Sequence, residues 1–329
     1  PEMDNNVSIK PLDTAVLLLI FNRPEMTSKV FDVIRSVQPK RLYIGADGPR
    51  PDRKDDAELV EQARQVVEDV DWNCEVKRLY QDDNLGCRNS VTDSITWFFE
   101  HEEDGIILED DCLPSQSFFG FCEQMLERYR DDSRIMMISG NNYKLDSSET
   151  VDDSYLFCRN YSCWGWATWK RGWDKFDRDL SDWNDEKLRI SLNYLSADKY
   201  VQKHYRFIFD LAKEDTRDIW DYQWQFACVF NYSLCIVPQK NMISNIGTDG
   251  VHFSGDSPVL FRKRYEIDVN RLKHPGYIYP DLNFEDELYR TILVPNIKRI
   301  VRRDSVIRKL KVIGIYSLLK NTRDTLLKK

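Results

Sequence analysis

The chain has 329 residues, of which 42% are hydrophobic and 31% charged, and its 16 Phe, 16 Tyr and 9 Trp make it rich in aromatic side chains. This composition excludes a disordered chain, and the length suffices for one large α/β domain with a sizeable core. The net charge is −8, but residues 295–329 hold eleven Lys and Arg against two Asp, so the remaining residues carry −17, which argues against a nucleic-acid partner.

Strand-like runs and helical patterns alternate through the first half of the chain. We expect strands at 16–21, 41–46, 74–80 and 105–108, and helices at 24–36, 54–70 and 88–100. Such alternation predicts an α/β fold with a mostly parallel sheet flanked by helices.

Polar residues follow three of these strands, in the segments Phe21–Arg23, Asp47–Pro49 and Glu109–Asp111. The carboxyl ends of parallel strands face one crevice, and ligands of open α/β sheets bind there. We therefore expect the three segments to converge on a ligand site.

The acidic segment Glu109–Asp111 follows the apolar run 106–108 and precedes the aromatic pair Phe118-Phe119. Carboxylates at a strand end supply the oxygen ligands that Mg²⁺ and Mn²⁺ prefer, and such a cation stabilises the charge of a leaving diphosphate. The alternative is a solvated acidic turn that caps the following helix. The buried strand before the acids and the aromatic helix after them favour the metal site.

The pattern of the second half is weaker. We expect a polar loop at 143–153, helices at 185–195 and 197–213, and a glycine-punctuated loop at 247–255. The Trp-rich stretch 161–173 has no clean period, and the apolar residues from 225 to 237 fit a strand or a helix.

The run Ile107–Asp111, followed by Phe118-Phe119, resembles the metal-binding motif of GT-A-fold glycosyltransferases, and its acids are most similar to the Glu-Asp-Asp of inverting N-acetylglucosaminyltransferases. Leu19–Arg23 and Gly45–Gly48 resemble the two strand ends that hold the uracil and ribose of UDP in that family. The resemblance spans about residues 15–255 and is more specific before residue 139 than after it. It implies a GT-A, Rossmann-like sheet with a C-terminal helical extension, and metal-dependent transfer of a hexose from a UDP-sugar.

The resemblance also implies roles for individual residues. Asp111 would be the direct ligand of Mn²⁺ or Mg²⁺, while Glu109 and Asp110 would contact the donor sugar or ribose. Asp47 would accept the uracil N–H. The residues beside the nucleotide would be Phe21, Asn22 and Arg23.

Asn84-Leu85-Gly86 resembles a turn that is common in sugar-nucleotide transferases. A glycine-permitted turn of this kind opens a helix beside an anion, so Asn84, Gly86 and Arg88 would lie near the diphosphate or the base. A hairpin-type turn and a surface arginine are the alternatives.

An inverting transferase needs a base near the acceptor hydroxyl, and Asp221 is our candidate. It lies in the segment 218–224, where Trp and Tyr neighbours suit a desolvated acid and sugar stacking. Asp218 competes for this role, and an ordinary helix acid is the alternative for both.

Two further candidates come from the second half. His252 follows a flexible loop and would contact the metal or the diphosphate, with a structural histidine as the alternative. Gly165-Trp166, in the Trp-rich stretch, would approach the donor or the acceptor, with core packing as the alternative.

We expect a GT-A domain at 1–260, with a nucleotide-binding half at about 14–140 and an acceptor half at 141–260, and an extension at 261–329. The longest apolar run is far shorter than the roughly 20 residues of a membrane-spanning helix, which predicts a cytoplasmic protein. The basic tail 295–329 has apolar residues near helical spacing. It suits peripheral contact with the cytoplasmic membrane face or packing on the acidic body.

The leading functional hypothesis is metal-assisted transfer from a UDP-sugar, with UDP-N-acetylglucosamine among the donors, to a carbohydrate or lipid-linked glycan, with inversion. A sugar-nucleotide pyrophosphorylase is one alternative, although residues 21–24 lack the glycine-rich basic loop that a triphosphate needs. A non-catalytic carbohydrate-binding protein is the other.

Overall fold

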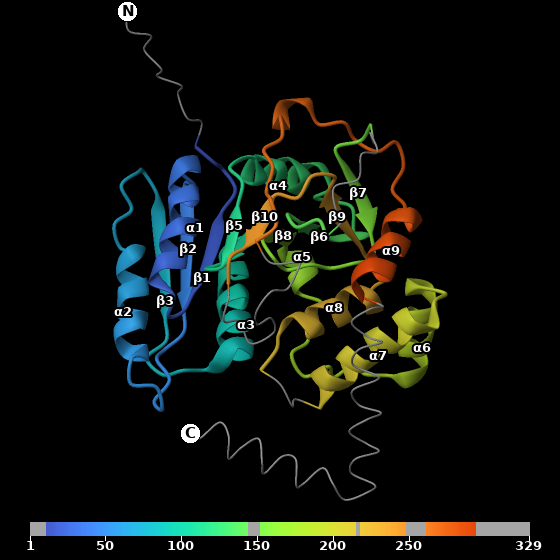
Figure 1. Cartoon of the computed structure of the whole chain (residues 1–329), viewed down its shortest axis with the longest axis horizontal. Coiled ribbons are helices and arrows are strands. Elements are labelled where there is room, and N and C mark those ends of the chain that lie inside the picture. The colour runs from blue at the N-terminus through green and yellow to red at the C-terminus, as the bar shows by residue number, and fades with distance from the viewer. Residues whose placement is uncertain (1–10, 144–151, 215–217, 248–260, 294–329) are drawn as a thin grey trace, which may run out of the picture.

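The computed structural model describes residues 11–143, 152–214, 218–247 and 261–293 (Figure 1). Its centre is one sheet of eight strands: β1 (Val16–Ile20), β2 (Arg41–Ala46), β3 (Glu75–Tyr80), β4 (Asp104–Glu109), β6 (Ile135–Ser139), β7 (Tyr155–Cys158), β8 (Trp166–Trp169) and β9 (Leu234–Pro238). The strand order is β3-β2-β1-β4-β8-β6-β9-β7. Six strands run in one direction, and β7 and β8 run in the other.

Helices cover both faces of this sheet (Figure 1). One face carries α1 (Pro24–Val37), α2 (Asp56–Val66) and α4 (Ser117–Arg128). The other carries α3 (Gly86–Phe99), α5 (Lys170–Trp173), α6 (Asp185–Leu195), α7 (Lys199–Lys213) and α8 (Asp221–Phe230). The predicted class, an α/β protein with a mostly parallel sheet flanked by helices, is therefore confirmed.

Strand β1 shows why the sheet is buried on both sides. All five of its residues are buried; Leu17 and Leu19 belong to the core under α3, and Leu18 and Ile20 to the core under α1. Successive side chains of a strand point to opposite faces, so a strand covered twice is apolar at every position.

Several predicted bounds match the structure. The strand at 41–46 and the helix at 185–195 have the expected limits, whereas the helix expected at 54–70 is confined to α2. The apolar residues that fitted either a strand or a helix form both, because α8 is followed by β9. A short antiparallel ribbon of β5 (Cys112–Pro114) and β10 (Ile243–Asn245) was not predicted.

Residues 261–293, which we assigned to an extension, pack across the body. This segment contains η1 (Val269–Arg271), α9 (Leu282–Leu288) and η2 (Tyr289–Leu293). Phe284 and Leu288 are buried in the core under α7, and Glu285 pairs with Arg159 in a largely buried ion pair. The basic tail from residue 294 onward lies outside the described residues. No helix within the described ranges is long and apolar enough to cross a membrane.

Candidate active site

The predicted acidic segment lies at the carboxyl edge of the sheet, beside the end of β1. Strand β1 pairs with β2 on one side and β4 on the other, so Leu19 is level with both Gly45 and Glu109. Beyond the strand ends, the backbone N–H of Phe21 donates a hydrogen bond of 3.3 Å to Asp110. The two strand-end segments therefore meet, as their position after parallel strands predicts.

Arg23 bridges two of the three acids. Its Nη1 atom lies 3.1 Å from Oδ1 of Asp110 and 2.9 Å from Oδ2 of Asp111. The carbonyl oxygen of Arg23 accepts hydrogen bonds from the N–H and the hydroxyl of Thr27, both at 2.9 Å, so the first turn of α1 fixes its backbone. The sequence placed Arg23 beside a nucleotide; the structure shows that it pairs with the acids.

Glu109 is the last residue of β4, and its carboxylate has no hydrogen bond or ion pair among the described residues. Burial raises the pKa of Glu109 well above its usual range, and the charges of Asp111 and Asp110 raise it further. Burial also raises the pKa of Asp110 to about 7, although the positive charge of Arg23 opposes the shift. The cluster therefore holds more carboxyl groups than Arg23 pairs with, and their burial and mutual repulsion favour the protonated forms.

Asp47 follows β2, and its carboxylate accepts hydrogen bonds from residues of two nearby loops. Its two carboxylate oxygens accept hydrogen bonds from the backbone N–H groups of Gly48, Leu85 and Gly86 and from the side-chain amide of Asn84, at 2.8 to 3.1 Å. Burial raises the pKa of Asp47, and these backbone bonds oppose the shift. Asp47 thus holds the turn at 84–86 in place, and its contact with a uracil stays a prediction.

The turn at Gly86 opens α3 as expected, but the anion beside it is part of the protein. Asp218 accepts hydrogen bonds from the N–H groups of Cys87 and Arg88 at 2.6 and 2.7 Å. Gly86 has a φ of +80°, and a Cβ there would lie 2.8 Å from Asp218, so glycine is required on both counts. A diphosphate at this helix start would have to displace Asp218, which argues against the predicted role of this turn.

Asp221, the predicted base, is the first residue of α8, and its charge acts on one of the acids. Its negative charge contributes to the raised pKa of Glu109, after burial and the charges of Asp111 and Asp110. It contributes likewise to the raised pKa of Cys163, after burial. The structure therefore brings Asp221, from the second half of the chain, close enough for its charge to act on Glu109.

The prediction for Gly165-Trp166 is wrong in part. The Trp166 side chain has no exposed surface and packs against Trp220, Trp224 and Trp173 in the core. Gly165 has a φ of +61° and is also buried. Core packing, the alternative we considered, explains the pair.

Trp164 and Tyr143 are the aromatic residues that the sequence did not single out. Both are only partly buried, and their rings meet edge to face with centroids 5.7 Å apart. Burial raises the pKa of Tyr143, the hydroxyl of Ser162 opposes this, and the charge of Asp221 is among the smaller contributions that raise it. The pair therefore lies close enough to Asp221 for its charge to act on Tyr143. The sequence could not show which tryptophan is partly exposed, because Trp164 and Trp166 lie in the same Trp-rich stretch, on either side of Gly165.

Phe21 and Asn22 are held by a second ion pair. The side-chain amide of Asn22 donates to Asp56 at 2.8 Å, Arg50 also pairs with Asp56, and the guanidinium of Arg50 lies 5.2 Å from the ring centre of Phe21. The bond to Arg50 lowers the pKa of Asp56 to about 2. These contacts fix the loop after β1 and leave the ring of Phe21 partly exposed.

Two of the acids offer the ligand type that a divalent cation shared with phosphate oxygens requires. No group of three or more His, Cys, Asp or Glu side chains is arranged as a metal site in the described residues, and His252 lies outside them. Asp110 and Asp111 nevertheless aim one oxygen each at a single point, which Nη1 of Arg23 marks. Two carboxylates with phosphate oxygens and water are an ordinary site for Mg²⁺.

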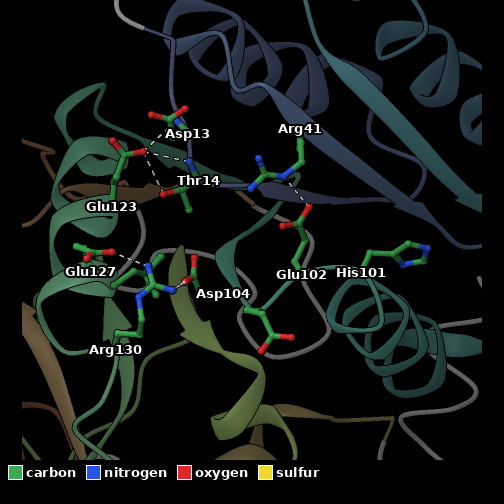
Figure 2. Close-up of a pocket in the computed structure, with 11 residues that line it drawn as sticks. Asp13, Thr14, Arg41, His101, Glu102, Asp104, Glu123, Glu127 and Arg130 are labelled. Carbon is green, nitrogen blue, oxygen red and sulfur yellow. Dashed lines mark hydrogen bonds and ion pairs between the residues drawn. The ribbon is translucent and has the colours of Figure 1, made fainter.

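A cavity at the opposite edge of the sheet is not this site (Figure 2). It has a volume of about 500 Å³ and lies at the amino ends of β1 and β4. Three of its acids have structural partners: Glu123 accepts from Thr14, Glu102 pairs with Arg41, and Asp104 pairs with Arg130. Because these acids already have partners within the protein, the polar lining of the cavity does not require a ligand.

No protein-family model matches the chain, and comparison with curated proteins gives no match. Among solved structures, the chain is similar to one described as UDP-glucose pyrophosphorylase complexed with UDP-glucose, at 10% sequence identity and a TM-score of 0.24. The match covers 45% of this chain and 64% of that chain, so this chain spans less than two thirds of it. A likeness this weak carries no argument about activity, and the functional conclusion rests on the site alone.

Proposed function

We propose that the protein is a metal-dependent glycosyltransferase that moves a hexose from a UDP-sugar to a carbohydrate acceptor. One observation carries this proposal: Arg23 meets the acidic segment Glu109–Asp111 at the carboxyl edge of a mostly parallel sheet, where the charge of Asp221 also acts on Glu109. Ligands of open α/β sheets bind at this edge, and an excess of carboxylates there suits a cation that binds a diphosphate.

Each group has a role in this chemistry. Asp110 and Asp111 would hold Mn²⁺ or Mg²⁺, which supplies charge stabilisation for the departing diphosphate. Arg23 would donate hydrogen bonds to phosphate oxygens. The carboxyl of Glu109, which is held against the other acids, would bind a hydroxyl of the donor.

Asp221 would act as the base. The acceptor oxygen forms a bond to the anomeric carbon, the bond from that carbon to the diphosphate oxygen breaks, and the acceptor proton passes to Asp221. This single displacement inverts the anomeric configuration, and a well-placed base contributes about 10²- to 10⁴-fold in rate. Trp164 and Tyr143 offer an apolar wall for a sugar face.

The basic tail suggests where the acceptor lies. Residues 295–329 carry a charge of +9 and apolar residues near helical spacing, which favours contact with an anionic membrane surface. We include in the proposal a lipid-linked glycan as acceptor and a position on the cytoplasmic membrane face.

Turnover tests the proposal. UDP release is measured from a panel of UDP-hexoses with Mn²⁺, for wild type, Asp111→Asn and Asp221→Asn, with and without glycan acceptors. We expect release by wild type and a loss of about 100-fold or more in Asp221→Asn. Pyrophosphate formed from UTP and a hexose 1-phosphate, without UDP release, would instead identify a pyrophosphorylase.

A further inference from the structure

Arg23 occupies the point at which Asp110 and Asp111 would hold a cation. One nitrogen, Nη1, lies about equally far from an oxygen of each acid, at 3.1 and 2.9 Å. A divalent ion binds carboxylate oxygens at roughly 2.0–2.2 Å, so the two acids need to close by less than about 1 Å to hold one in the same place. The guanidinium nitrogen and a metal ion therefore cannot occupy this point at the same time.

The side chain of Arg23 can leave this position while its backbone stays in place. The backbone precedes Pro24 at the start of α1 and is held by Thr27, so it does not depend on the ion pairs. The Arg23 side chain is 29% exposed, against 7% for Asp110 and 14% for Asp111, so it reaches the acids from the open side of the site. A long side chain on a fixed backbone can exchange one partner for another.

We propose that Arg23 competes with the divalent cation for Asp110 and Asp111, and that the diphosphate of the nucleotide releases this competition by pairing with Arg23. A guanidinium binds phosphate oxygens in a bidentate manner, so the exchange replaces one set of charge-assisted hydrogen bonds with another. Metal and nucleotide then favour each other's binding, and the free protein binds metal weakly. The nucleotide half of this inference rests on the proposed function, whereas the competition itself does not.

The competition is tested with Mn²⁺ alone. Binding to nucleotide-free protein is followed by electron paramagnetic resonance for wild type, Arg23→Gln and Arg23→Lys. The control is Arg35→Gln, which removes an arginine of the same helix that pairs with Asp32 and Asp71 at the surface. Arg23→Gln should bind Mn²⁺ about tenfold or more tightly than wild type, because a unit charge about 3 Å from the ligand oxygens has been removed. Arg23→Lys should fall between them, and Arg35→Gln should match wild type.

Equal or weaker Mn²⁺ binding by Arg23→Gln would overturn the competition. The variant leaves two acids without a counter-charge, so its folding is checked by thermal unfolding with and without Mn²⁺. Mn²⁺ should raise its melting temperature more than that of wild type, and an equal or smaller rise also counts against the inference.

The coupling to nucleotide is measured by repeating the titration with saturating UDP. UDP should tighten Mn²⁺ binding in wild type by a larger factor than in Arg23→Gln, whereas equal factors would reject the release by diphosphate. Failure of the proposed function is distinct, because it would appear as no UDP binding by wild type whatever the result with Mn²⁺ alone.

Discussion

The carboxylate of Asp218 accepts a hydrogen bond of 2.7 Å from the backbone N–H of Arg88, 130 positions earlier in the chain. A second bond, from Cys87, completes a clamp on the start of α3. Because Asp221 is only three residues further along, this clamp ties the proposed base to the edge of the sheet. The sequence suggested Asp218 as a rival base, whereas the structure shows it capping the start of α3, and we expect it to act as a positioning residue for Asp221.

Replacing Asp218 by Ala should destabilise the protein and weaken catalysis together. Loss of a carboxylate that caps a helix start costs about 0.5–2 kcal/mol of unfolding free energy. Urea denaturation measures this, with the exposed Asp82→Ala as control. Asp218→Asn keeps an acceptor oxygen and should recover part of the stability. Wild-type stability in Asp218→Ala would contradict the clamp.

The two neighbouring tryptophans should respond differently to substitution. Trp166→Ala opens a cavity in the core and should lower the free energy of unfolding by about 3–5 kcal/mol. Trp164→Ala should leave stability closer to wild type and weaken binding of the sugar substrate, read as a higher KM. The reverse pattern would contradict the assignment of Trp164 to the wall of the site.

Stability of the metal-free protein should fall with rising pH because of the acidic cluster. The native pKa of Asp110 is raised to about 7, and that of Glu109 is raised well above its usual range. The native state therefore holds protons that the unfolded chain releases near pH 4, and the stability they contribute is lost as pH rises toward 7 and above.

Glu109→Gln tests this pH dependence. Gln cannot ionise, so the melting temperature of the variant, measured with a chelator present, should rise relative to that of wild type between pH 5 and pH 8. The exposed Glu103→Gln serves as control and should keep a constant difference from wild type. If the difference in melting temperature between Glu109→Gln and wild type were also constant across this pH range, the pKa of Glu109 would not be raised in the native state.

Deletion of residues 295–329 should abolish binding to liposomes that contain anionic lipid. The segment holds eleven basic residues, and each contributes about 1 kcal/mol near an anionic surface. Co-sedimentation measures the binding, and neutral liposomes give the baseline. Unchanged binding of the truncated protein would reject the proposed membrane contact.

The sequence was most informative where burial determines the pattern. The run 16–20 is apolar at every position because both faces of β1 are covered, and this placed the strand and its polar end correctly. The three-residue strands β5 and β10 carry too short a pattern to be seen. The meeting of residues 21–23 with the acids followed from strand topology alone.

Roles that depend on partners distant in sequence could not be predicted. Asp47 was expected to accept from a uracil, but its bonds come largely from residues 84–86, which only the fold brings beside it. The convergence of Arg23 with the acids was predicted, but its pairing with Asp110 and Asp111, across 87 and 88 positions, was not. Side-chain chemistry suggested a charged site in both cases, and tertiary contacts decided which group pairs with which.

Calorimetric titration of UDP, with and without Mn²⁺, into wild type and Asp111→Asn tests the central claim most directly. The site described here predicts UDP binding by wild type that Mn²⁺ strengthens, and loss of that metal dependence in Asp111→Asn. Absence of UDP binding by wild type in the presence of Mn²⁺ would contradict a nucleotide-sugar site at this edge of the sheet.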